Sequence, residues 1–106
     1  MPKYLLEVSY SAEGAKGLLK DGGTKRRAAA DAAIKSVGGS IEAFYYAFGD
    51  VDVYSIIDAP DNASVAAASI AIGASGGATV KTIALMTTAD IDAAVKKNAA
   101  YTPPGR

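Results

Sequence analysis

Two of the commonest catalytic residue types are missing from this sequence, which contains no histidine and no cysteine. Thiolate chemistry and a disulfide framework are therefore excluded, and the most frequent general base is absent. The acids left as candidates for acid–base or metal chemistry are Glu7, Glu42, Asp50 and Asp52. Carboxylate oxygens suit Mg²⁺ or Ca²⁺, but the spacing matches no calcium-loop motif. We expect no metal and no other cofactor, and we favour a local turn role for Asp50 and Asp52.

Glu7, Lys81, Tyr46 and Tyr54 are the candidates for a ligand-binding site on one face of a sheet. A carboxylate buried in apolar surroundings becomes a stronger base, so Glu7 is a candidate catalytic base and Asp52 is the other. The tyrosines would orient the substrate. Alternatively, a buried ion pair between Glu7 and Lys81 only fixes how two copies of the chain align. Which tyrosine shares the face stays open, because a one-residue change in strand register exchanges them.

A second candidate site follows the glycine pair at residues 22–23. Thr24, Lys25 and Arg26 stand there at the predicted start of a helix, where N–H groups and the helix dipole favour an anion. The spacing of a phosphate-binding Walker loop is absent. We favour the alternative, a helix break followed by a solvated basic turn.

Hydrophobic periodicity supplies the elements that must position these residues. Four strands are predicted, over residues 3–10, 40–48, 51–58 and 78–86. Helices are predicted between Ser11 and Gly22, between Thr24 and Gly38, over residues 63–75, and from Thr88 onward. This order indicates an α+β fold of the ferredoxin-like, split βαββαβ type, with a four-stranded antiparallel sheet and helices on one face. Residues 1–97 are expected to form this domain and residues 98–106 a tail.

The second and third strands are apolar on both faces, although a sheet with helices on one side needs only one apolar face. Each large side chain left in water forfeits about 1.5–3 kcal/mol, and exposed apolar patches usually mark interfaces. We therefore predict that two copies pack sheet to sheet, in a dimeric α+β barrel-like association. The alternative is that the last helix or the tail covers this face.

The alanine-rich segment 63–75 has no clearly charged side. A helix that is apolar all round is buried on more than one side, so this helix could contact another subunit. A weakly amphipathic surface helix rich in alanine explains the pattern equally well.

Composition narrows the range of partners. The chain has 106 residues, and its 11 basic and 11 acidic residues cancel, so it gains little from binding nucleic acid. The longest charge-free stretch, residues 62–80, is too polar and too broken by glycine for a membrane helix. Glu7 interrupts the first apolar run before a signal-peptide core could form. We expect a cytoplasmic protein with neither nucleic acid nor membrane as its partner.

The segment 42–54, Glu-Ala-Phe-Tyr-Tyr-Ala-Phe-Gly-Asp-Val-Asp-Val-Tyr, resembles the hairpin of the GYD domain family of small bacterial proteins. Residues 2–5 and 9–20 resemble that family too, and the likeness extends to about Asp92. Val51 stands where the family pattern Gly-x-Tyr-Asp has tyrosine. The resemblance implies a ferredoxin-like fold and oligomerisation, without a known activity. The hairpin is also similar to that of the ligand-sensing domains of feast/famine transcription regulators, which bind amino acids between subunits.

Three functions are compatible with these features. The first, favoured by the lack of histidine and cysteine, is a homo-oligomer that binds a small apolar or amino-acid-like ligand at a subunit interface. The second is a cofactor-independent enzyme of the dimeric α+β barrel type, with Glu7 or Asp52 as base. The third is a purely structural oligomeric subunit.

Overall fold

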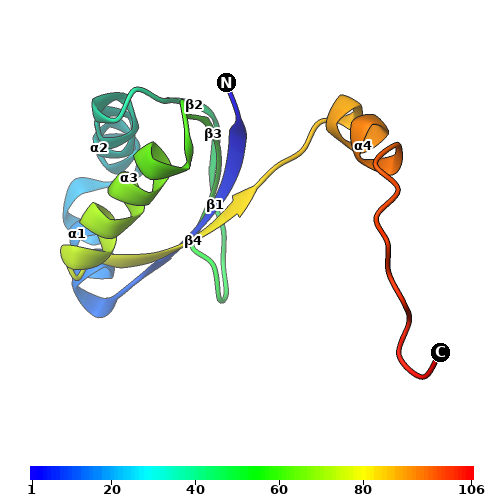
Figure 1. The fold of residues 1–106 in the computed structure, drawn as a ribbon. Coiled ribbons are helices and arrows are strands. Elements are labelled where there is room, and N and C mark those ends of the chain that lie inside the picture. Colours follow the sequence, from blue (N-terminus) through cyan, green and yellow to red (C-terminus); the bar gives the residue numbers. More distant parts are fainter.

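A computed structural model describes residues 1–106 as a helix-backed sheet followed by a separate C-terminal helix (Figure 1). The sheet has four antiparallel strands in the order β2-β3-β1-β4, and α1, α2 and α3 cover one of its faces. The predicted α+β, ferredoxin-like fold is confirmed. The elements are β1 (Lys3–Tyr10), α1 (Ala12–Asp21), α2 (Gly23–Ser36), β2 (Ser40–Tyr46), β3 (Val53–Asp58), α3 (Asn62–Ala74), β4 (Ala78–Ala84) and α4 (Thr88–Val95).

The first crossover consists of two helices, as the glycine pair predicts. Ser11 caps α1, because its side chain accepts a hydrogen bond from the N–H of Gly14. Gly22 has φ +81°, a conformation that glycine adopts without strain, and it separates α1 from α2. Thr24 was expected to cap α2, but Gly22 holds that position and Thr24 lies within the first turn.

The core lies between the sheet and its helices and is small, since only ten of the 106 residues are buried. Ile57 at the centre of β3 is fully buried. Leu19 of α1 points away from this core and is 88 % exposed. Gly14, Gly17 and Leu18 are the positions that turn inward, and Leu19 falls one position outside this helical spacing.

Helix α3 packs on the sheet through Val65 and Ala68. Its outer side remains apolar and uncovered, with Ile70 70 % exposed. Within one chain, α3 is therefore covered on one side only.

Strands β2 and β3 differ from the prediction in the length of the loop between them and in the register of β2. The predicted strands 40–48 and 51–58 leave two residues between them, but β2 ends at Tyr46 and β3 starts at Val53, with residues 47–52 between them. In β2 the register shifts between Ile41 and Ala43, so Glu42 forms a β-bulge. Because side chains alternate along a strand, the bulge reverses the faces of all later β2 residues.

The C-terminal part of the chain does not cover the second face of the sheet. Helix α4 stands apart from the body, beyond the end of β4, and none of its residues is buried (Figure 1). The radius of gyration is 16.9 Å, against about 13 Å for a compact domain of this size. No helix has the length and apolar character that crossing a membrane requires.

Candidate functional site

The face of the sheet opposite α1, α2 and α3 has no cover within the chain (Figure 1). Strand pairing aligns eight side chains in its central part, between the pairs Lys3–Asp58 and Ser9–Thr79, and we call this central surface the open sheet face. Its aromatic member on β2, Tyr45, is 72 % exposed. The open sheet face comprises Leu5, Glu7, Ala43, Tyr45, Tyr54, Ile56, Lys81 and Ile83.

Glu7 lies at the centre of this face, on the inner strand β1. Its direct cross-strand neighbours are Tyr54 on β3 and Lys81 on β4. The carboxylate of Glu7 forms no hydrogen bond within the chain, and it lies more than 4 Å from the ammonium group of Lys81. Two opposite charges therefore stand side by side among apolar side chains, and neither has a partner.

The predicted grouping of Tyr46 with Glu7 needs correction. The bulge at Glu42 turns Tyr46 to the helix-covered face, where its hydroxyl donates a hydrogen bond of 2.8 Å to the carbonyl of Gly23. Tyr45 occupies the position on the open sheet face that was predicted for Tyr46, and it pairs directly with Tyr54. Sequence reasoning missed Tyr45, because no residue type in this segment marks a bulge.

The remaining acids have structural partners. Glu42 and Asp58 accept hydrogen bonds from the ammonium of Lys3 at 3.0 and 2.9 Å, and these bonds, that of Asp58 first, raise the pKa of Lys3. The Asp52 carboxylate accepts a 2.7 Å bond from the backbone N–H of Tyr10. The partner of Asp52 therefore lies on β1 and not within its own turn, where a role was expected. The backbone carbonyl of Asp50, and not its carboxylate, accepts a hydrogen bond from the hydroxyl of Ser9. Nowhere do three acidic side chains gather as metal ligands would.

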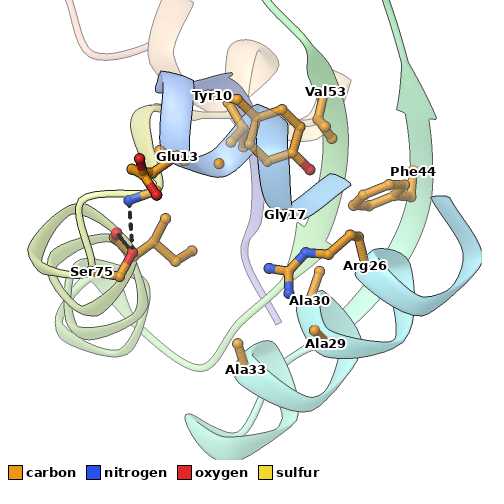
Figure 2. A pocket seen from close by; sticks show the side chains of 15 residues that line it. Tyr10, Glu13, Gly17, Arg26, Ala29, Ala30, Ala33, Phe44, Val53 and Ser75 are labelled. Atoms are coloured by element: carbon orange, nitrogen blue, oxygen red, sulfur yellow. Dashed lines mark hydrogen bonds between the residues drawn. The ribbon is translucent and has the colours of Figure 1, made fainter. Parts of the chain in front are cut away.

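The basic residues at the start of α2 face a carboxylate. Lys25 and Arg26 each approach Asp21 to 3.7 Å, and Thr24 is exposed to solvent. Asp21 offsets the positive charge that an anion would meet at this helix start. Arg26 also lines the space beneath the helices (Figure 2).

The strand order and the single helical layer define a ferredoxin-like α+β domain, with a charged pair in an uncovered sheet face. The model of the GYD domain family matches residues 4–95, and the chain belongs to this family. The match spans all four strands and all four helices, including α4. No curated protein and no solved structure matches the chain significantly.

Proposed function

We propose that the chain is the subunit of a homodimer that pairs two open sheet faces and binds a small amino-acid-like molecule between them. The observation that carries this proposal is the pair of unpartnered charges on the uncovered face, Glu7 on the inner strand β1 and Lys81 beside it on the edge strand β4. Face-to-face sheets pack about 10 Å apart, so such a dimer would enclose both charges.

The apolar surroundings of the charged pair support association with a second copy. Leu5 is flanked by Ile56 and Ile83 on its two neighbouring strands, so three aliphatic side chains form one continuous row. Burial of each would contribute about 1.5–3 kcal/mol, which matters for a domain with so few buried residues. Each face meets an identical face in a two-fold dimer, so one patch supplies both sides of the interface.

The charges support an amino-acid-like ligand. Burial of an unpaired carboxylate or ammonium group is costly, and a partner of opposite charge removes most of the cost. The α-ammonium group of an amino acid would meet Glu7, its α-carboxylate would meet Lys81, and an aliphatic side chain would contact the row formed by Leu5, Ile56 and Ile83.

The dimer is tested by native mass spectrometry and sedimentation of the full chain. Leu5→Asp would place a charge in the interface, and dimerisation is expected to weaken by at least a hundredfold. Leu19→Asp is the matched control, because Leu19 is an equally large but fully exposed side chain on α1. A monomeric wild-type protein at millimolar concentration, or equal behaviour of both variants, would refute the dimer.

The ligand is tested by calorimetric titration with L-leucine. Glu7→Gln and Lys81→Met should each weaken binding at least tenfold, whereas Lys35→Met on the far side of the molecule should not. A dimer that binds no amino acid and is weakened by both substitutions would instead indicate the structural subunit, with Glu7 of one copy paired to Lys81 of the other. Turnover of a bound compound that is lost in Glu7→Gln would indicate the enzyme.

A further inference from the structure

A second site lies on the opposite side of the sheet from the open sheet face. A cavity of about 320 Å³, partly open to solvent, lies between the sheet and helices α1, α2 and α3 (Figure 2). Val8 and Val53 form its floor, and Phe44 closes one wall. Its volume falls at the lower end of the range for small-molecule sites, about 300–1,000 Å³.

The cavity exists because the helices above it carry very small side chains. Helix α2 presents Ala29, Ala30 and Ala33 to it, and α1 presents Gly17. A Cβ atom added at Gly17 would meet no atom within 4 Å, so unfilled space begins directly at the helix backbone. Cores are normally packed to high density, and a space of this size lined by apolar atoms accommodates an apolar molecule.

One basic group lines this apolar space. The guanidinium of Arg26 extends into it from α2, beneath the ring of Tyr10 (Figure 2). The guanidinium of Arg26 donates no hydrogen bond within the chain, and its Nη1 atom forms an ion pair with Asp21 at 3.7 Å, which is longer than a hydrogen bond. Its forked N–H donors match a carboxylate in shape and charge.

Two neighbouring residues restrict the ligand further. Burial raises the pKa of the Tyr10 phenol, so its hydroxyl keeps its proton and remains a donor. Glu13 lines the rim on the side of α1 and would repel a second anionic group. The ligand therefore needs a single negative charge at one end only.

We propose that this cavity binds a small monocarboxylic acid with a hydrocarbon body, whose carboxylate pairs with Arg26 and whose chain occupies the space beneath Gly17 and the α2 alanines. The site lies within one chain and needs no second copy, so it is independent of the dimer proposed above.

Octanoate is a suitable probe, followed by ¹H–¹⁵N correlation spectra and calorimetry on the full chain. Gly17→Leu should fill the cavity and abolish binding. Gly73→Leu is the matched control, because Gly73 is also helical and free of neighbours at its Cβ position but lies outside the cavity. Both variants should fold, since each replaces a helical glycine without a clash.

Arg26→Met separates charge recognition from packing. It should weaken octanoate binding at least tenfold and leave the binding of octanol unchanged. Wild-type affinity for octanoate in both Gly17→Leu and Arg26→Met would overturn the proposal, as would signal changes confined to the open sheet face. Leu5→Asp should retain octanoate binding, so failure of the dimer and failure of the cavity are distinguishable.

Discussion

The two faces of the same sheet differ in opposite ways. The open sheet face carries full-sized side chains, such as Tyr45 and Ile56, and has nothing above it. The covered face has three helices above it, but α1 and α2 present glycine and alanine where larger residues would fill the space. The open sheet face has large side chains without a covering layer, and the covered face has a covering layer with side chains too small to fill the space beneath it. Both conditions underlie the sites that we propose, one for a second copy and one for a small molecule.

The neighbouring residues Ile56, on the open sheet face, and Ile57, on the covered face, allow this contrast to be tested. Ile57 is fully buried among the helices, so Ile57→Ala should lower the free energy of unfolding by about 2–5 kcal/mol at any protein concentration. Ile56→Ala should cost less than about 1.5 kcal/mol in dilute protein and more in concentrated protein, because its partners belong to a second copy. Denaturant unfolding at two concentrations measures both. Equal costs that do not depend on concentration would contradict the shared face.

Two glycines of α1 test how tightly the covering layer is fitted. A Cβ at Gly14 would overlap the carbonyl oxygen of Gly77, so Gly14→Ala should destabilise the fold by about 1–3 kcal/mol. Gly17→Ala should stabilise it by about 0.5–1 kcal/mol, since alanine favours the helix and the cavity admits a methyl group. Thermal unfolding followed by circular dichroism compares the two. Stabilisation by both substitutions would mean that α1 is free to move away from the sheet.

The cap of α3 tests how that layer responds to pH. Asp61 accepts a hydrogen bond of 2.8 Å from the N–H of Ser64, and hydrogen bonding by the side chain and then the backbone of Ser64 lowers the Asp61 pKa below 3.8. A carboxyl with a lower pKa in the folded state stabilises the fold above its unfolded pKa, and this stabilisation is lost as the pH falls through the folded value. Asp61→Ala should lower the melting temperature by a few degrees at pH 7, and the difference should shrink below about pH 4. A difference that is constant with pH would show that the carboxylate charge is irrelevant.

The adjacent tyrosines of β2 give the smallest expected effect. Tyr46→Phe removes the hydrogen bond to Gly23 on the covered face and should cost about 0.5–1 kcal/mol. Tyr45→Phe removes no hydrogen bond within the chain and should leave the stability of dilute protein unchanged. Denaturant titrations of the two variants in parallel measure the difference. A larger cost for Tyr45→Phe would place Tyr45, not Tyr46, against the helices.

The order of elements could be predicted because the chain marks it locally. Alternation in β1 places Tyr4 and Leu6 on the buried face, and glycine pairs mark the ends of α2 and α3. The same alternation brings Glu7 and Lys81 together, and the register confirms that they are direct neighbours. Such features depend on residues a few positions apart, which a sequence pattern records well.

The bulge and the cavity could not be predicted, because both depend on contacts between distant segments. The bulge at Glu42 follows from how β2 fits β3, and it alone decides that Tyr45 joins the open sheet face. The cavity depends on the height at which α1 and α2 settle above the sheet. Its local signs are the spacing of Gly14 and Gly17, since glycines three positions apart place a bare strip on one side of a helix, and the alanines of α2.

Hydrogen bonds at the junction of β1 and α1 decide where the chain tolerates an inserted residue. The backbone N–H of Ser11 donates to the carbonyl of Gly77 at 2.9 Å, and the hydroxyl of Ser11 donates to the carbonyl of Gly76 at 2.6 Å. These two bonds connect the end of β1 to the turn that precedes β4. An inserted residue in the turn at 75–77 would have to lift α1 and widen the cavity. The hairpin loop at 47–52, by contrast, carries the fully exposed ring of Phe48. Extra residues in this loop would not require any helix to move.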